Sequence, residues 1–331
     1  MFTTADNVSL RLTRRKGGAR GPVLLSHCIG VSSLMYLIDT QPVNLVEFLY
    51  GHGFDVWLLD HRLSIEMRAS REQSTMDDVA TKDYPAAVAK VCELSGQDSV
   101  QVVAHGVGSS TFTMAMLAGL QGVRSAVCSQ VSTHLVVPKI NRLKTTLRMS
   151  QLLWMLGIRS MTAYVDQQSP WTSKLYNASL RLYPVAGEER CNNPVCHRIS
   201  AMYGALYEHD QVGTQTHEAL HEMFGIVNLT AFRQLSLIIR RGHLVDANGR
   251  ESYLPHIERL GIPIAFIHGA DNDCVLPEST EITYNLLRER NGQDLYSRLL
   301  APGYGHVDCI FGENASTDIF PFILKHLSQS A

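Results

Sequence analysis

The sequence has no long apolar run, no block of like charge and no regular cysteine framework. None of its 331 residues falls in an apolar stretch of transmembrane length, and the N-terminus lacks the apolar core of a signal peptide. The formal net charge is −2 without a long basic run, which argues against nucleic acid as a partner. The seven cysteines are an odd and scattered set, which favours reduced thiols over disulfides. These absences predict a cytoplasmic protein without a transmembrane segment.

Short apolar strands alternate with longer helical segments in both end regions of the chain. This alternation predicts an α/β fold with a mostly parallel, doubly wound sheet that helices cover on both faces. Between residues 136 and 255 helical periods dominate, which predicts a helical cap or lid inserted into a core of residues 1–135 and 256–331. The expected strands are 22–27, 54–60, 99–104, 125–128, 262–268 and 296–300, and the expected helices are 43–51, 76–95, 107–119, 278–290 and 319–327.

Residues 102–109, Val-Val-Ala-His-Gly-Val-Gly-Ser, have the frame of a nucleophile elbow but lack the nucleophile. The central position, where Ser, Cys or Asp belongs, is Gly106, which adopts strained backbone angles at little steric cost. Three explanations stay open: natural loss of nucleophilic catalysis, an engineered inactivating substitution, or attack by a neighbour such as Ser109, Ser110 or Cys28. The third is disfavoured because a residue two or three positions into a helix points away from the turn.

Two further segments carry residues that such an elbow would need. Asp271 and Asp273 follow the strand that ends near His268, and a carboxylate there can orient a histidine and stabilise its imidazolium form. His306 lies in the glycine-flanked segment Pro302-Gly-Tyr-Gly-His, after the last core strand. The chain order elbow, acid, histidine is the order found in α/β-hydrolases.

The end of the first core strand is expected to supply an oxyanion hole. The pair His27-Cys28 stands where such enzymes have His-Gly, so the expected donors are the backbone amides of Ile29 and Val107. Cys28 narrows the approach to the backbone and brings a thiol near the site, although a buried cysteine more often packs as a small apolar residue. His27 and His105 are auxiliary candidates, and for His105 a local structural hydrogen bond is the favoured role.

The chain resembles the α/β-hydrolase superfamily over nearly its whole length. Two segments, Phe54-Asp-Val-Trp-Leu and Gly305–Gly312, are similar to the acid-lipase branch. Three others resemble the hydrolase-like domain associated with bacterial glucose–methanol–choline (cholesterol-oxidase-like) oxidoreductases, namely Gly53–Asp60, Gln121–Gln130 and Glu189–His197. The likeness implies His306 as base with Asp271 as its partner, and Asp273 is the rival because it stands four residues before Pro277.

This resemblance implies an enzyme acting on a lipophilic ester, lactone or related carbonyl compound, with a possible functional link to an oxidoreductase. Gly106 and Cys28 depart from the family pattern at the nucleophile and at the oxyanion turn. These departures argue against ordinary ester hydrolysis, whereas the predicted fold does not depend on them. Two alternatives therefore stand beside hydrolysis: a lyase, cyclase or isomerase that uses the His–Asp pair as general base, and a non-catalytic protein that binds a small lipophilic ligand. No cofactor is expected.

Three other signals favour plainer interpretations. His217-Glu218-Ala-Leu-His221 matches the H-E-x-x-H zinc motif, but the pattern recurs by chance and no third ligand is evident. Cys191-Asn-Asn-Pro-Val-Cys196-His197 could bind a metal or close a small loop, and a structural turn is favoured. We therefore expect no metal. The cationic and apolar segment 142–156 could touch a membrane surface, although a lid helix packed over an apolar pocket is the more common case.

Overall fold

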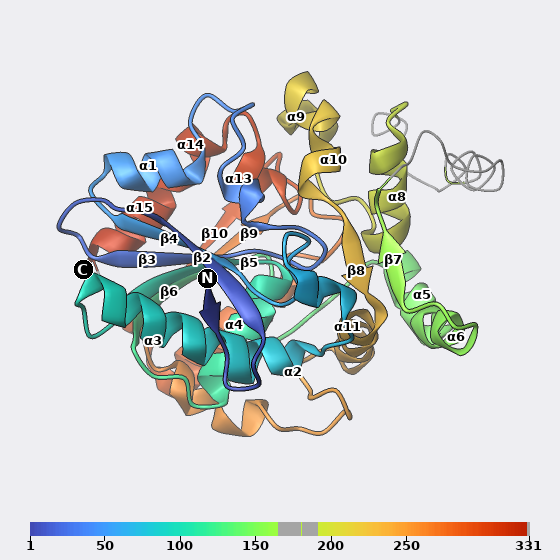
Figure 1. Ribbon diagram of the computed structural model, residues 1–331, viewed down its shortest axis with the longest axis horizontal. Helices are drawn as coiled ribbons and strands as arrows, with labels where there is room; N and C mark the ends of the chain where they lie inside the picture. The colour runs from blue at the N-terminus through green and yellow to red at the C-terminus, as the bar shows by residue number, and fades with distance from the viewer. Residues whose placement is uncertain (165–179, 181–190, 330–331) are drawn as a thin grey trace.

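The computed structural model describes residues 1–164, 180 and 191–329, and Figure 1 shows its ribbon. Its centre is an eight-stranded sheet in the order β1-β2-β4-β3-β5-β6-β9-β10. The six strands from β4 to β10 pair in parallel, while β1 and β2 form an antiparallel edge. The strands are β1 (Phe2–Thr3), β2 (Ser9–Arg15), β3 (Pro22–Ser26), β4 (Asp55–Asp60), β5 (Val100–His105), β6 (Val123–Ser129), β9 (Ile264–Gly269) and β10 (Tyr296–Ala301).

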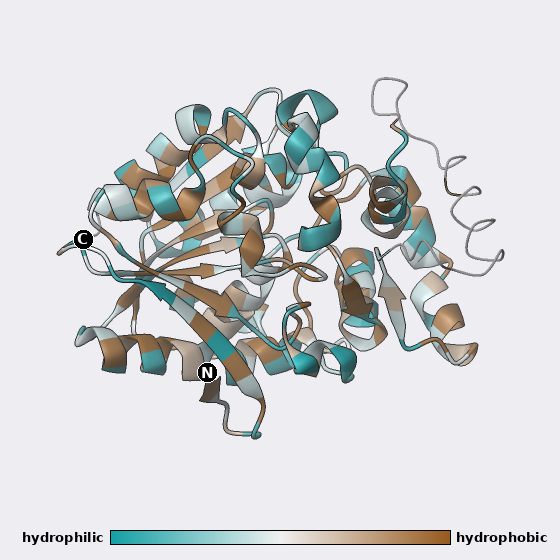
Figure 2. Ribbon diagram, turned by 45° about the horizontal axis from the view of Figure 1, so that its top comes forward, coloured by the Kyte–Doolittle hydropathy of each residue, from teal (hydrophilic) through white to brown (hydrophobic). Residues whose placement is uncertain are grey.

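Alternation along the central strands divides the core into two apolar layers, one on each face of the sheet. In β3, Leu24 packs into one layer while Val23 and Leu25 pack into the other, because successive side chains of a strand point to opposite faces. Every residue of β3, β4 and β5 is buried, which explains their nearly continuous apolar sequences and their hydrophobic colour in Figure 2. The parallel strands end at the same edge, so their carboxyl ends bring distant segments of the chain together.

Helices from both ends of the chain cover these two layers. The first layer lies under α3 (Tyr84–Ser95), α4 (Val107–Leu117) and α12 (Glu278–Asn291). The second lies under α1 (Leu45–Gly51), α13 (Asp308–Phe311) and α15 (Phe320–Gln329). Two short helices complete the core, α2 (Met76–Asp78) and α14 (Ala315–Asp318).

Local sequence sets where several of these helices begin and end. The Asn44 side chain accepts a hydrogen bond from the Glu47 backbone amide at the start of α1. Thr75 and Asp78 form a reciprocal capping box at α2. Pro85 stands in the first turn of α3, where a missing N–H costs nothing, and the helix ends at Gly96 in the left-handed conformation.

The described helices and strands between residues 139 and 241 lie to one side of the sheet (Figure 1). We call residues 136–255 the inserted segment. Its strands β7 (Ser160–Thr162) and β8 (Ile226–Asn228) form a small antiparallel sheet. No helix among the described residues is long and apolar enough to cross a membrane. The described helices of the segment are α5 (Lys139–Thr146), α6 (Met149–Met155), α8 (Pro194–Tyr203), α9 (Thr214–Glu218), α10 (Leu220–Met223) and α11 (Leu229–Arg241).

The predicted α/β fold with a mostly parallel, helix-covered sheet is confirmed. All six expected core strands are present within two residues of their predicted bounds. The expected helix 76–95 is interrupted by a wider π-helical turn at Val79–Asp83. The strands β1, β2, β7 and β8 were not predicted, because they are short or only partly buried. The stretch 189–197, used for the family resemblance, begins with two residues that lie outside the described ones.

Candidate functional site

The expected elbow lies between β5 and α4, and Gly106 stands at its centre. Its backbone angles, φ 56° and ψ −127°, belong to a region that side-chain-bearing residues rarely adopt. The turn is fixed by two backbone hydrogen bonds, from the Gly106 amide to Ser129 and from the Ser110 amide to Gly106. Gly108 lets α4 approach β3, since a Cβ there would lie 2.3 Å from the His27 carbonyl oxygen. The turn therefore has the backbone geometry of an elbow, with a glycine at its centre.

The Cys28 side chain occupies the space that a nucleophile at position 106 would need. A Cβ placed on Gly106 would lie 2.7 Å from Cys28 Sγ and 3.0 Å from His306 Nε2. The backbone amide of Val107, an expected oxyanion donor, already donates to Cys28 Sγ over 3.3 Å. Burial raises the pKa of the Cys28 thiol to about 11, so it is uncharged at neutral pH. The thiol thus blocks both the nucleophile position and one donor of the oxyanion hole.

His306 meets an asparagine at the position where a triad has its acid. Its Nδ1 lies 3.0 Å from Nδ2 of Asn272, a buried residue just after β9. Asn272 Oδ1 accepts hydrogen bonds from the backbone amides of Cys274 and Val275, both at 2.9 Å, which fixes the orientation of the amide group. The Nδ2 group therefore donates to His306 Nδ1 and, over 2.9 Å, to Gln130 Oε1.

This contact determines which nitrogen of His306 carries the proton. Because Nδ1 accepts a hydrogen bond, the neutral ring is protonated on Nε2, the nitrogen that lies 3.0 Å from the Gly106 Cβ position. Burial holds the pKa of His306 well below its usual value, and the neighbouring rings of His105 and His268 lower it further. At neutral pH the group is a neutral hydrogen-bond donor, which is the opposite of a general base at Nε2.

Neither Asp271 nor Asp273 forms the expected pair with His306. Both side chains are exposed. Asp271 accepts a hydrogen bond from the Gly303 amide over 2.7 Å and so fastens the loop that leads to His306. The predicted His–Asp pair is therefore wrong, and His306 contacts Asn272 instead. Asn272 stands between the two aspartates, and it was not predicted because a triad acid is expected to be a carboxylate.

The auxiliary histidines have local partners behind the site. His27 Nδ1 lies 2.6 Å from the Cys28 carbonyl oxygen, and its ring stacks on His61 at 4.0 Å. His105 Nδ1 lies 3.0 Å from Ser129 Oγ, and burial lowers its pKa to about 3. The ring of His105 packs edge-on against His306. Neither His27 nor His105 is among the described residues that line the cavity beside His306.

The two serines considered as substitute nucleophiles are both buried in α4. Ser109 Oγ donates to the Val131 carbonyl oxygen. Ser110 lies one turn from Gly106, and its Oγ is buried. Neither hydroxyl stands at the turn of the elbow.

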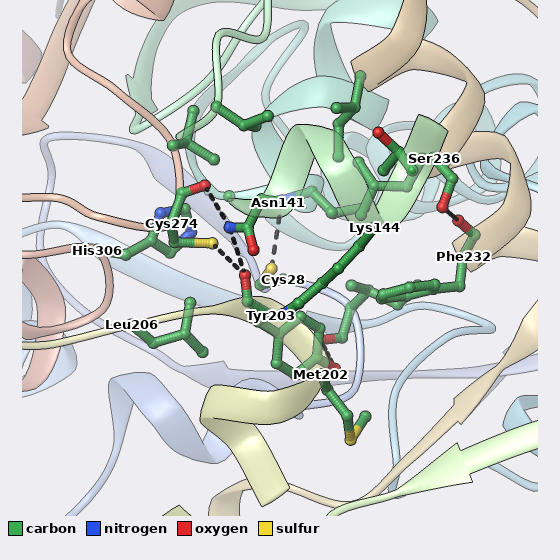
Figure 3. Close-up of a pocket in the computed structure, with 18 of the residues that line it drawn as sticks. Cys28, Asn141, Lys144, Met202, Tyr203, Leu206, Phe232, Ser236, Cys274 and His306 are labelled. Carbon is green, nitrogen blue, oxygen red and sulfur yellow. Dashed lines mark hydrogen bonds between the residues drawn. The ribbon is translucent and has the colours of Figure 1, made fainter. Parts of the chain in front are cut away.

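An apolar cavity of about 380 Å³ opens from this site towards the inserted segment. Figure 3 shows His306 and Cys274 at one end, and Phe232 and Ser236 of α11 at the other. Among its described lining residues only Lys144 carries a formal charge at neutral pH. Burial lowers the pKa of Lys144 to about 8, and its Nζ donates to the Ala201 carbonyl oxygen over 3.2 Å. Further lining residues include Ile29, Val107, Met149, Leu153, Met202, Tyr203 and Leu235.

The H-E-x-x-H motif does not form a zinc site of its own. His217 belongs to α9 and His221 to α10, and Ala219 separates the two helices. The His221 ring is exposed, and its Nδ1 lies 2.8 Å from the Glu218 carbonyl oxygen. The two imidazoles therefore have different surroundings.

Comparison with known proteins agrees with this architecture. A family model described as alpha/beta hydrolase fold matches residues 21–313. The chain is 22% identical to Lipase lipl-3 of Caenorhabditis elegans over 92% of this chain and 79% of that protein. It is 30% identical to Lipase 1 of Drosophila melanogaster, but over only 33% of this chain and 27% of that relative. The crystal structure of Paleococcus ferrophilus monoacylglycerol lipase superposes with a TM-score of 0.57 at 14% identity and covers 98% of this chain and 100% of that chain.

The family match and the lipase relatives support a hydrolase-like enzyme for ester substrates, without fixing its reaction class. The likeness to the solved structure concerns the fold alone. The more specific resemblance to the domain associated with glucose–methanol–choline oxidoreductases stays a prediction. On the match to residues 21–313, the chain belongs to the alpha/beta hydrolase fold family.

Proposed function

We propose that this protein binds a lipophilic carbonyl compound, such as an ester or lactone, non-covalently in the cavity beside His306, and that it forms no acyl-enzyme. The observation that carries the proposal is the Asn272–His306 hydrogen bond, which leaves the proton on Nε2. A triad needs the opposite arrangement, in which the acid accepts Nδ1–H and Nε2 takes the proton of the nucleophile. Any turnover of an ester in this site therefore proceeds without a covalent intermediate.

Three separate features oppose acyl transfer. Gly106 offers no attacking atom, the Val107 amide is engaged by Cys28 Sγ, and His306 cannot accept a proton at Nε2. Each involves a different segment of the chain. Their coincidence supports natural loss of nucleophilic catalysis over engineering, because a designed inactivating change at Gly106 alone would leave a glycine at position 28 and a carboxylate beside His306.

The same features suit recognition of a carbonyl group. A neutral Nε2–H donor in a buried site can bind a carbonyl oxygen and polarise it without bringing a charge into the apolar cavity. The largely apolar lining gives affinity for the hydrocarbon part of the ligand. Because the described lining residues other than Lys144 are uncharged at neutral pH, the site favours a ligand without a formal charge.

The inserted segment is proposed as the cap that sets ligand size and shape. Its helices contribute Met149, Met202, Tyr203 and Phe232 to the lining of the cavity. The boundaries 136–255 remain proposals, as do the cytoplasmic location and the link to an oxidoreductase.

The experiment is a binding series with matched variants. Calorimetric titration of lactones, esters and fatty acids of increasing chain length should give affinity that grows with chain length. His306→Ala should weaken carbonyl ligands about 5- to 30-fold, the equivalent of about 1–2 kcal/mol for one buried hydrogen bond. His256→Ala, which changes an exposed histidine, is the control and should leave affinity unchanged. Equal affinity of the wild type and His306→Ala for every ligand would refute the role of Nε2–H.

A second candidate function is thioester-forming hydrolysis through Cys28. The favouring observation is that its Sγ lies 2.7 Å from the Gly106 Cβ position and accepts the Val107 amide at the start of α4. Its raised pKa opposes this function, because the thiolate is the nucleophile. Intact mass after incubation with a p-nitrophenyl ester separates the two functions. An acyl adduct present in the wild type and missing in Cys28→Ala would establish the second and overturn the first.

A further inference from the structure

Four potential metal ligands come together in the inserted segment, outside the cavity described above. They are Cys191, Cys196, His209 and His217, and their sulfur and ring nitrogen atoms all lie within 4.8 Å of one another. Cys196 Sγ and His209 Nε2 are 3.7 Å apart. The ring centroids of His209 and His217 are 5.0 Å apart. None of the four lines the cavity beside His306.

The cluster has features that ordinary packing does not explain. Both cysteines are free thiols, and Cys196 is buried. His217 Nε2 is a buried nitrogen with no hydrogen-bond partner among the described residues. Buried polar atoms in native proteins usually have a partner, so an unpaired imidazole nitrogen beside two thiols points to a ligand.

The ligand types and spacings match one particular ion. Two sulfurs and two imidazole nitrogens in a tetrahedral arrangement are characteristic of Zn²⁺. With Zn–S near 2.3 Å and Zn–N near 2.0 Å, ligand atoms in such a site lie about 3.3–3.8 Å apart. The 3.7 Å between Cys196 Sγ and His209 Nε2 falls in that range, and the 4.8 Å limit for the whole set leaves only a small contraction on binding. We propose that Cys191, Cys196, His209 and His217 bind one structural Zn²⁺ ion.

Neighbouring hydrogen bonds hold these ligands in place. The Asn193 side chain accepts from the backbone amides of Val195 and Cys196, which starts α8 with Cys196 in its first turn. The same side chain donates to the His217 carbonyl oxygen over 2.8 Å. His197 Nε2 lies 2.9 Å from the Cys191 carbonyl oxygen. One asparagine thus links the segments that carry Cys196 and His217, as expected for the surroundings of a metal centre.

The proposed site is structural because protein atoms fill all four positions. A catalytic zinc keeps one position for water or substrate. The H-E-x-x-H interpretation used His217, Glu218 and His221, but His221 is exposed and outside the cluster. His217 is therefore the only residue common to that motif and to the proposed site.

The ion would hold together the part of the inserted segment on which the loop that carries His306 rests. The Leu206 carbonyl oxygen accepts the backbone amides of His306 and Val307, and the Glu208 amide donates to Asp308 Oδ2. His209 follows directly in the chain. Binding of His209 to an ion shared with α8 therefore restrains the backbone against which the His306 loop rests. This role is independent of whether the cavity catalyses a reaction.

The test is the metal content of the full-length chain, purified in the presence of reductant and without chelator. Elemental analysis should give about one zinc per chain, as for a single four-ligand site. Cys196→Ser and His217→Ala should lose most of the zinc and lower the Tm. Cys92→Ser, which removes a half-buried thiol of α3, is the matched control and should retain zinc and Tm.

A second measurement uses only wild-type protein, so it tests the site even when the variants fail to fold. Wild-type protein stripped by chelator and titrated with Co²⁺ should show the visible bands of tetrahedral cobalt and a thiolate-to-cobalt charge-transfer band, both saturating at about one equivalent. Three results would each overturn the proposal: no zinc and no cobalt spectrum in folded wild-type protein, full zinc content in Cys196→Ser, or an intact mass that shows a Cys191–Cys196 disulfide in zinc-free protein.

Discussion

Replacing Gly106 with alanine adds one methyl carbon at the point where the chain turns from β5 into α4. That carbon would lie 2.7 Å from Cys28 Sγ and 3.2 Å from Cys28 Cβ, so the thiol must move or the turn must distort. Overpacking of this kind costs about 1–3 kcal/mol. The backbone angle of φ 56° costs a side-chain-bearing residue about a further 1–3 kcal/mol. The free energy of unfolding should therefore fall by about 2–6 kcal/mol in Gly106→Ala.

Thermal unfolding followed by circular dichroism measures this loss. For a chain of 331 residues the predicted decrease in Tm is about 3–9 °C, from an unfolding entropy of about 2.1 cal/mol/K per residue. In a Cys28→Gly background the clash with Cys28 disappears, so Gly106→Ala should cost only the backbone strain and the 3.0 Å contact with His306 Nε2. The double-mutant cycle should give a coupling free energy of about 1–3 kcal/mol between the two positions. An unchanged Tm in Gly106→Ala, or an equal loss in both backgrounds, would refute the reasoning.

Three further predictions concern catalysis, ligand charge and pH. The triple variant Cys28→Gly, Gly106→Ser, Asn272→Asp should hydrolyse p-nitrophenyl esters with burst kinetics, whereas Gly106→Ser alone should not; activity of the single variant would show that His306 is already a base. Carboxylate binding should change as pH passes through about 8, where Lys144 loses its charge, and Lys144→Met should remove this step; a step that persists in the variant would contradict the assignment. Burial lowers the pKa of His105 from its ordinary value to about 3, so below about pH 6.5 the unfolded chain binds more protons than the folded chain. The free energy of unfolding should therefore decrease as pH decreases, by about 1.4 kcal/mol per pH unit for this group. His105→Gln should flatten this slope in denaturant titrations, and an unchanged slope would contradict the assignment.

The fold could be predicted because buried parallel strands leave a strong sequence signal. The strand Val100–His105 is buried at every position and reads as an apolar run before a glycine-rich turn. The strand Ser9–Arg15, next to the short edge strand β1, alternates polar and apolar residues with three arginines, and this weak pattern was missed. Strands could therefore be predicted from the local sequence pattern where all their residues are buried.

The site could be predicted only in part, because its chemistry depends on which neighbouring side chain points inward. Asp271, Asn272 and Asp273 are consecutive, and the backbone course after β9 directs Asn272 to His306. The contact between Cys28 and Gly106 joins the ends of two different strands, so it cannot be predicted from the spacing of residues along the chain.

The Cys–His cluster was missed for a similar reason. Cys191 and Cys196 stand in one motif and His217 in another, whereas His209 stands in no motif. Only the folded inserted segment brings all four together.

The central claim is the protonation state of His306, and ¹⁵N NMR of the histidine rings measures it directly. At neutral pH the wild-type His306 should show a protonated Nε2 and an unprotonated Nδ1, and Asn272→Asp should reverse this pattern because a carboxylate accepts Nδ1–H. The His306→Ala spectrum assigns the signals. A wild-type ring protonated on Nδ1 with a free Nε2 lone pair would contradict the account, because His306 could then serve as a general base.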